Sequence, residues 1–180
     1  MRLLQYIIES SKEDHIGLFI GRMQGLTTGH TDVINLMSKT FSKSYVVLVK
    51  GEKSSSDKKR NPLPFEIQKK MIEKVLPSNV DLLVTKSANL EDLLPTIDGK
   101  SFVVYAGPDR VKDYRSYVKY ATKLGYKVQI VDTGQMIPRD DSVSGTKLRQ
   151  ALKADDFEAF KKITPKEIWS IYQDLKEYME

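Results

Sequence analysis

The sequence predicts an α/β protein with a Rossmann-like three-layer α/β/α sandwich, a five-stranded parallel sheet and C-terminal helices. Five short apolar runs alternate with segments of helical spacing along the 180 residues, and this alternation is typical of βαβ units. The runs are continuously apolar, as expected for strands covered on both faces. After the fifth run only helical patterns follow, which places the helical extension at the C-terminal end of the sequence.

Each expected strand is rich in β-branched and aromatic residues and is bounded by glycine, proline or polar residues. The five strands are expected over residues 16–20, 45–49, 80–85, 102–107 and 126–131. Apolar residues at helical spacing predict helices between them. Pro64 suits the first turn of the helix expected up to Pro77, and Asn89 suits the N-cap of a short helix after the third strand. Three further helices are expected over residues 144–153, 157–162 and 165–178.

These elements predict a single Rossmann-like domain with a segment before it and a helical extension after it. The domain is expected over residues 15–153, preceded by an amphipathic segment of residues 1–14. Residues 154–180 are expected to form a helical extension that packs on the same domain. A hydrophobic content of 40% is sufficient for one core, and the length fits one domain.

Composition excludes several classes of site. The chain has no cysteine and only two histidines, so disulfides, thiolate zinc sites and histidine-rich metal cages are excluded. The net charge of +5 favours partners that carry phosphate. Because no apolar run approaches a membrane span and no signal-peptide pattern is present, we expect a soluble, cytoplasmic protein without a membrane partner.

The turn after the first strand is the expected ligand site, because open α/β sheets bind ligands beyond the carboxyl ends of their strands. Residues 21–30 have the sequence GRMQGLTTGH. This is neither the dinucleotide fingerprint GxGxxG nor the P-loop GxxxxGK(S/T), so a dehydrogenase-like domain is disfavoured. His30 falls in the first turn of the next helix, where unpaired amide groups and the helix dipole favour a phosphate.

Two segments resemble motifs of one enzyme superfamily. Residues 21–30 are similar to its G-R-F-x-P-x-(H/T)-x-G-H motif, and residues 143–149, VSGTKLR, are similar to its (I/V)-S-(S/G)-T-x-x-R motif. The sequence thus resembles the nucleotidylyltransferases related to cytidylyltransferases and to nicotinamide-mononucleotide adenylyltransferases. Residues 106–111, AGPDRV, resemble a turn of small phage-encoded members. The departures are Thr27, Met23 and Gly25, where the superfamily commonly has His, Phe and Pro.

The resemblance implies a reaction and a set of site residues. It implies that a nucleoside monophosphate is transferred from ATP or CTP to a phosphomonoester, with Mg²⁺ as the accompanying ion and without a metal site built from protein side chains. The residues implied in catalysis are His30, Thr27, Arg22 and Arg149. Those implied in nucleotide binding are Gly21, Gly29, Ser144, Gly145, Thr146 and Asp109.

Several alternatives stay open at this stage. Adenylyl transfer to nicotinamide mononucleotide is the first interpretation, and cytidylyl transfer to a phosphorylated alcohol is the close rival. A nucleotide- or nucleic-acid-binding module without catalysis is a third, supported by basic residues on one face of the helix over residues 110–123, although nucleic acid is the weaker option. Asp109 and Ser144 also suit ordinary helix caps. Residues 51–60 suit either a lid over the triphosphate or a solvated loop, and a homo-oligomer is left open.

Overall fold

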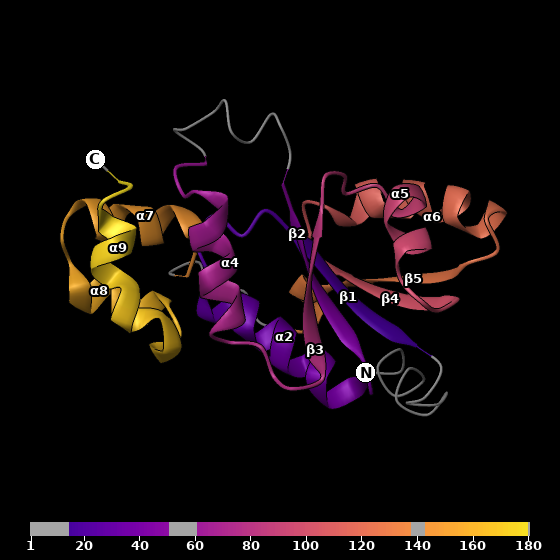
Figure 1. Ribbon diagram of the computed structural model, residues 1–180, viewed down its shortest axis with the longest axis horizontal. Coiled ribbons are helices and arrows are strands. Elements are labelled where there is room, and N and C mark those ends of the chain that lie inside the picture. The colour runs from indigo at the N-terminus through magenta and orange to yellow at the C-terminus, as the bar shows by residue number, and fades with distance from the viewer. Residues whose placement is uncertain (1–14, 51–60, 138–142, 180) are drawn as a thin grey trace.

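The computed structural model describes residues 15–50, 61–137 and 143–179 (Figure 1). The amphipathic segment predicted for residues 1–14 lies outside the described residues, as do residues 51–60, for which the sequence left a lid and a solvated loop open. Among the helices of the described part, none combines the length and the apolar character that crossing a membrane requires.

The centre of the fold is a parallel five-stranded sheet. Its strands are β1 (Ile16–Gly21), β2 (Ser44–Val49), β3 (Val80–Thr85), β4 (Ser101–Ala106) and β5 (Lys127–Asp132). They lie in the order β3-β2-β1-β4-β5, and every neighbouring pair is parallel. Leu18 of the central strand is in register with Tyr45 on one side and Val104 on the other. The order reverses at β1, so a ligand is expected beyond the carboxyl ends of β1 and β4.

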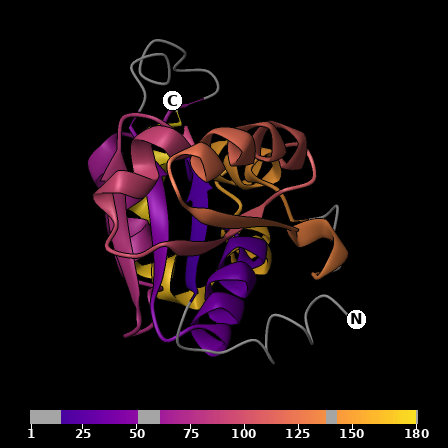
Figure 2. The same cartoon turned by 90° about the vertical axis from the view of Figure 1, so that its right-hand side faces the viewer.

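Helices cover both faces of the sheet, as Figures 1 and 2 show. One face packs against α2 (Thr28–Thr40) and α4 (Phe65–Glu73), with Phe19 and Met37 in its core. The other face packs against α5 (Leu90–Leu93), η1 (Leu94–Thr96) and α6 (Val111–Lys123), with Leu18 and Tyr114 in its core. Alternate residues of β1 therefore enter different cores, which is why its apolar run is continuous.

The C-terminal helices pack beside α4 and extend the molecule at one end (Figure 1). They are α7 (Gly145–Lys153), α8 (Phe157–Ile163), η3 (Lys166–Ile171) and α9 (Tyr172–Lys176). A third core joins Leu148 and Phe160 of these helices to Leu26, which precedes α2, and to Leu63, which precedes α4. This third core holds the loop after β1 between α4 and α7.

The predicted fold class is confirmed, with two corrections to the helices. The helix expected over residues 165–178 is a 3₁₀ turn followed by a short α-helix. Ile168 and Ile171 are both buried, and residues three apart share one face in a 3₁₀-helix. The helix expected up to Pro77 ends at Glu73, because Pro77 has no N–H to bond the carbonyl of Glu73, four residues earlier, and its ring clashes with that carbonyl in a helix.

Candidate functional site

A cavity of about 510 Å³ lies at the carboxyl ends of β1, β4 and β5, where the strand order reverses. Its walls come from the loop after β1, the first turn of α2, the turn after β4 and the segment after β5. Six of the residues predicted from sequence line it: Gly21, Arg22, Thr27, Gly29, His30 and Asp109. These residues come from two separate parts of the chain, and the fold brings them together.

His30 is held in one orientation by Thr27. The backbone N–H of Thr27 donates to Nδ1 of His30 at 3.1 Å, and the Thr27 hydroxyl lies 2.8 Å from the same nitrogen. Because a backbone N–H is always a donor, Nδ1 is the unprotonated acceptor and the proton of the neutral ring is on Nε2. Thr27 is the N-cap of α2, so this arrangement is the capping box that the sequence T-x-x-H makes at the helix start.

Burial also keeps the His30 ring neutral. It lowers the pKa of His30 from 6.5 to about 4, because the charged imidazolium would lose its hydration. The ring packs against Phe19 with its centroid 5.9 Å from that of the phenyl ring. The residue is half-buried and still reaches the cavity. At neutral pH the cavity therefore meets an uncharged imidazole whose Nε2–H is a hydrogen-bond donor.

The resemblance implies a catalytic role for Thr27, and the structure shows where its hydroxyl lies. Thr27 is 3% exposed, and its hydroxyl faces His30. The physical reason is that a buried hydroxyl requires a partner, and Nδ1 of His30 is within reach. The structure thus makes Thr27 a residue that orients the imidazole.

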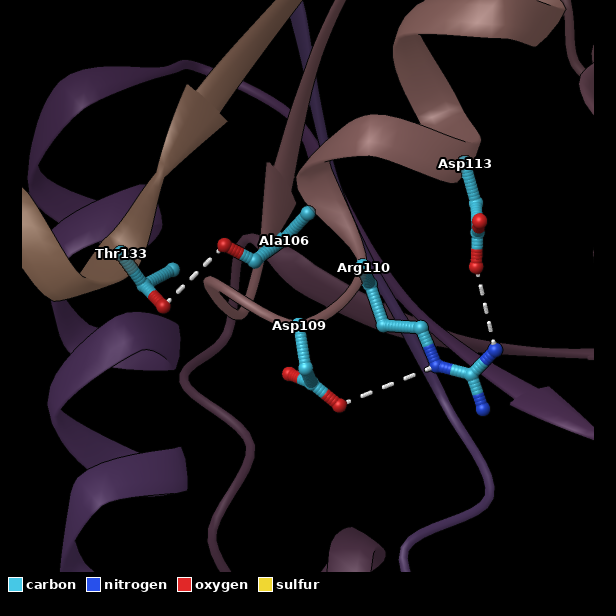
Figure 3. Close-up of polar contacts among 5 residues, drawn as sticks. All are labelled: Ala106, Asp109, Arg110, Asp113 and Thr133. Carbon is cyan, nitrogen blue, oxygen red and sulfur yellow. Dashed lines mark hydrogen bonds and ion pairs between the residues drawn. The ribbon is translucent and has the colours of Figure 1, made fainter.

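The turn between β4 and α6 forms the second wall (Figure 3). Asp109 lies at the rim with its side chain 82% exposed, and Nε of Arg110 is 4.0 Å from its carboxylate. Nη1 of Arg110 also contacts Asp113 at 3.4 Å. Across the turn, the hydroxyl of Thr133 donates to the carbonyl of Ala106 at 3.2 Å and ties the ends of β4 and β5 together. Asp109 therefore presents a carboxylate at the cavity and is not the N-cap of α6, which is Arg110.

The start of α7 borders the cavity without forming its wall. Val143 lines the cavity, whereas Ser144, Gly145, Thr146 and Arg149 are not among its lining residues. Ser144 is the N-cap of α7 and accepts from the amide of Lys147 at 3.2 Å. Nη2 of Arg149 donates to the Thr146 hydroxyl at 3.3 Å. The guanidinium is thereby held over the first turn of the helix.

Gly25 brings this helix against the loop after β1. A Cβ atom at Gly25 would lie 3.4 Å from the side chain of Leu148 and 3.8 Å from Cα of Gly145. Leu26 of the first sequence motif and Leu148 of the second pack in the same core, so the two motifs, far apart in the chain, lie side by side here. The start of α7 is therefore next to the loop that leads to the imidazole at the start of α2.

Sequence reasoning did not select several residues of the cavity. They are Asp32 on α2 and Pro108, Thr133, Gly134 and Ile137 at the ends of β4 and β5. Thr133 and Gly134 closely follow a predicted strand, and this position could have marked them as ligand-site candidates, because open α/β sheets bind ligands beyond the carboxyl ends of their strands. Within the described residues no group of three or more His, Cys, Asp or Glu side chains is placed to hold a metal ion.

The match to a known family covers most of this architecture. Residues 18–151 match the model of the cytidylyltransferase-like family. The chain belongs to the cytidylyltransferase-like family. The matched residues include most of β1 with its loop, the other four strands and most of α7, so both walls of the cavity and the start of α7 are part of the family domain.

Two comparisons add individual relatives of this cytidylyltransferase-like chain. Phosphopantetheine adenylyltransferases of Streptococcus pneumoniae, from strain Hungary19A-6 and from serotype 19F strain G54, are each 32% identical to it over 93 residues. The match covers 51% of this chain and 54% of each relative, so the chain spans about half the length of the curated relatives it matches.

Solved structures share the fold at lower identity. The Plasmodium falciparum nicotinic acid mononucleotide adenylyltransferase complexed with NaAD has a TM-score of 0.58 and 17% identity, covering 92% of this chain and 98% of that one. The Francisella tularensis bifunctional NMN adenylyltransferase/ADP ribose pyrophosphatase complexed with AMP and a Mn ion has a TM-score of 0.60 and 18% identity, covering 91% of this chain and 52% of that one. These likenesses establish the fold of this family member.

Proposed function

We propose that the protein is a nucleotidyltransferase that transfers adenylyl from ATP to nicotinamide mononucleotide and releases pyrophosphate. The observation that carries this proposal is the cavity at the reversal of strand order, which His30 and Arg22 both line and which the start of α7 borders at Val143. The family match supports nucleotidyl transfer. The relatives and the structural neighbours described above are adenylyltransferases, and this supports ATP over CTP as the donor.

In this reaction an oxygen of the acceptor phosphate attacks the α-phosphorus of ATP, and the bond from that phosphorus to the α,β-bridging oxygen breaks, so that this oxygen leaves with pyrophosphate. A phosphomonoester has a second pKa near 6, so it is a nucleophile at neutral pH without a protein base. Catalysis then consists of aligning the two reactants and stabilising the charge on the transferred group. The cavity supplies donors for this purpose: Nε2–H of His30 for an α-phosphate oxygen and the Arg22 guanidinium for the acceptor phosphate.

The start of α7 suits the leaving pyrophosphate. The amides in the first turn of an α-helix lack carbonyl partners within the helix. Ser144 satisfies the amide of Lys147, which leaves those of Gly145 and Thr146 for phosphate oxygens. Arg149, fixed against the Thr146 hydroxyl, adds a planar guanidinium that can grip two phosphate oxygens at once.

Asp109 and Gly107 suit the nucleoside of the donor. Asp109 is folded back so that its Oδ1 lies 2.9 Å from where a Cβ of Gly107 would be, and both residues line the cavity. A carboxylate at this rim can accept hydrogen bonds from ribose hydroxyls. We therefore assign the donor nucleoside to the side of the cavity formed by β4 and β5.

Mg²⁺ fits this site as an ion that enters with the triphosphate. The described residues offer no cluster of three acidic or histidine ligands, and Mg²⁺ in such sites is held largely by phosphate oxygens and water. When bound, the ion would neutralise charge on the triphosphate. His30, Arg22 and Arg149 position the phosphates independently of it.

A panel assay tests the proposal. ATP and CTP are each incubated with nicotinamide mononucleotide, nicotinate mononucleotide, phosphopantetheine and a phosphorylated alcohol, and pyrophosphate release is measured. We expect ATP with nicotinamide mononucleotide to give the highest kcat/KM, and the His30→Ala variant to lose the signal. CTP with the phosphorylated alcohol as the best pair would replace the proposal with cytidylyl transfer. Absence of pyrophosphate release from all pairs would remove the enzymatic interpretation.

One observation favours a second candidate, a nucleic-acid-binding module. Lys112, Arg115, Lys119 and Lys123 are all exposed on α6, and Tyr120 beside them is 51% exposed. Cations interleaved with an aromatic ring suit a single-stranded nucleic acid. The test is binding of a single-stranded oligonucleotide at increasing salt: a steep linear fall of log affinity with log salt, unchanged in His30→Ala, supports this function and is not expected for a small-molecule enzyme.

A further inference from the structure

The loop after β1 contains two residues in the left-handed region of backbone space. Met23 has φ 46° and Gly25 has φ 148°. A non-glycine residue at positive φ is disfavoured and is maintained only where the surroundings impose it. Met23 is 4% exposed and lines the cavity. The strained segment therefore directly precedes Leu26 and the Thr27–His30 capping box.

Gln24, between these two residues, is bound to a distant part of the backbone. Its Nε2 donates to the carbonyl of Leu63 at 3.3 Å, and its Oε1 accepts from the amide of Leu63 at 3.0 Å. The side-chain amide of Gln24 thus bonds both the N–H and the C=O of Leu63, the two groups that a neighbouring β-strand would otherwise bond. Leu63 is 2% exposed and belongs to the connection that leads from β2 into α4.

Leu63 is itself firmly held. Nε2 of Gln68, a buried residue of α4, donates to the same carbonyl at 2.7 Å. The side chains of Leu63 and Leu26 pack in the same core with Leu148 of α7. Gln24 is therefore bonded to a residue whose own position is fixed. Such a bond can hold the loop in a backbone conformation that is disfavoured by itself.

We propose that Gln24 is a positioning residue, whose two hydrogen bonds to Leu63 hold the strained loop at residues 23–25 and thereby place Thr27 and His30 against the substrate. The resemblance and the family match assign no role to this side chain. The proposal rests on the proposed function for its effect on catalysis. Its structural part, that Gln24 orders the loop, is independent of the reaction.

A pair of matched variants tests this role. Gln24→Met removes both bonds to Leu63 at nearly constant volume, and Gln68→Met removes one bond to the same carbonyl without touching the loop. We expect Gln24→Met to lower kcat by about tenfold to a hundredfold, because small displacements of a catalytic group cost this much, with a smaller change in KM. Gln68→Met should lower Tm and keep kcat within about twofold of the wild type.

Two further readouts distinguish positioning from general stability. Amide hydrogen exchange of peptides covering residues 22–30 should increase in Gln24→Met and stay at the wild-type level in Gln68→Met. In Gln24→Glu, a protonated carboxyl restores one donor and one acceptor, so its activity relative to the wild type should rise as the pH falls. This variant also provides the test if Gln24→Met does not fold.

The outcomes are separable. The proposal is overturned if Gln24→Met and Gln68→Met have the same kcat and the same amide hydrogen exchange of residues 22–30. It is also overturned if the activity of Gln24→Glu relative to the wild type does not depend on pH. If the wild type turns over no acceptor, the proposed function fails, and the exchange of residues 22–30 still decides whether Gln24 holds the loop.

Discussion

The hydroxyl of Thr27 and the backbone amide of the same residue both face Nδ1 of His30, at 2.8 and 3.1 Å. This relationship fixes the orientation and the tautomer of the imidazole, while burial lowers its pKa and keeps it neutral. A neutral ring suits a site that receives a triphosphate, because its Nε2–H donates a hydrogen bond in a defined direction without requiring a buried cation. The first predictions test this relationship.

Loss of the imidazole should slow the reaction without unfolding the protein. In His30→Gln we expect kcat to fall by about 10²–10³, the usual cost of removing one donor to a developing charge. The KM for ATP should change little, because the triphosphate is held mainly at α7. Steady-state pyrophosphate release measures both constants. A variant with normal kcat would exclude His30 from the reaction.

Removal of the Thr27 hydroxyl should weaken catalysis through His30. Thr27→Val keeps the shape and the backbone bond but removes one hydrogen bond, worth about 1 kcal/mol, so we expect kcat to fall by about fivefold. Thr27→Ser keeps a hydroxyl and should retain most of the activity. Long-range ¹H–¹⁵N NMR spectra of the imidazole provide an independent check, since the wild type should show the Nε2–H tautomer. A Thr27→Val enzyme as active as Thr27→Ser contradicts the orienting role.

Acid should destabilise the folded state through His30. Its pKa is about 4 in the folded protein and 6.5 unfolded, so the unfolded chain binds the proton more tightly and stability falls as the pH drops from 6.5 toward 4. One pKa unit corresponds to about 1.4 kcal/mol, and with a discount for the part of the ring that reaches the cavity we expect a loss of about 2 kcal/mol. Urea unfolding of the wild type and His30→Gln between pH 7 and pH 4 measures the difference. If the free energy of unfolding of the two proteins falls equally from pH 7 to pH 4, His30 does not cause the loss.

Much of the fold and part of this site could be predicted from the sequence. The strand positions followed from apolar runs, because burial on both faces leaves a continuous pattern. The cavity edge followed from Gly21 and His30, because parallel strands end at one side of the sheet. The packing of Leu26 with Leu148 could not be predicted, since it depends on how the third core packs α7 against the loop.

The same limit applies to the roles of single atoms. A threonine three residues before a histidine predicts a helix start, but the sequence does not tell whether the hydroxyl faces a substrate or the imidazole. Tertiary burial of Thr27 decided this. The pairing of Gln24 with Leu63 likewise joins residues 39 positions apart, and no local pattern indicates it.

Substitution of Gly25 should damage both stability and activity, and a second glycine provides the control. In Gly25→Ala the φ of 148° is strained for an L-residue, whereas the new Cβ would meet Leu148 at 3.4 Å, an ordinary van der Waals distance. Such backbone strain costs of the order of 1–3 kcal/mol. Because Leu26, the next residue, packs in one core with Leu148 and so holds the loop of His30 against α7, we also expect kcat/KM to fall by about tenfold or more.

Gly125→Ala separates the two effects. Gly125 has φ 83°, so alanine is strained there as well, but nothing lies within 4 Å of its Cβ position and the residue is in the turn between α6 and β5. This variant should lose comparable stability and keep its kcat/KM. Urea unfolding and pyrophosphate release on both proteins make the comparison. If Gly125→Ala loses as much activity as Gly25→Ala at equal stability, the contact between the two motifs has no special role in catalysis. If only Gly25→Ala loses activity, the spacing between the His30 loop and the start of α7 is what the reaction requires.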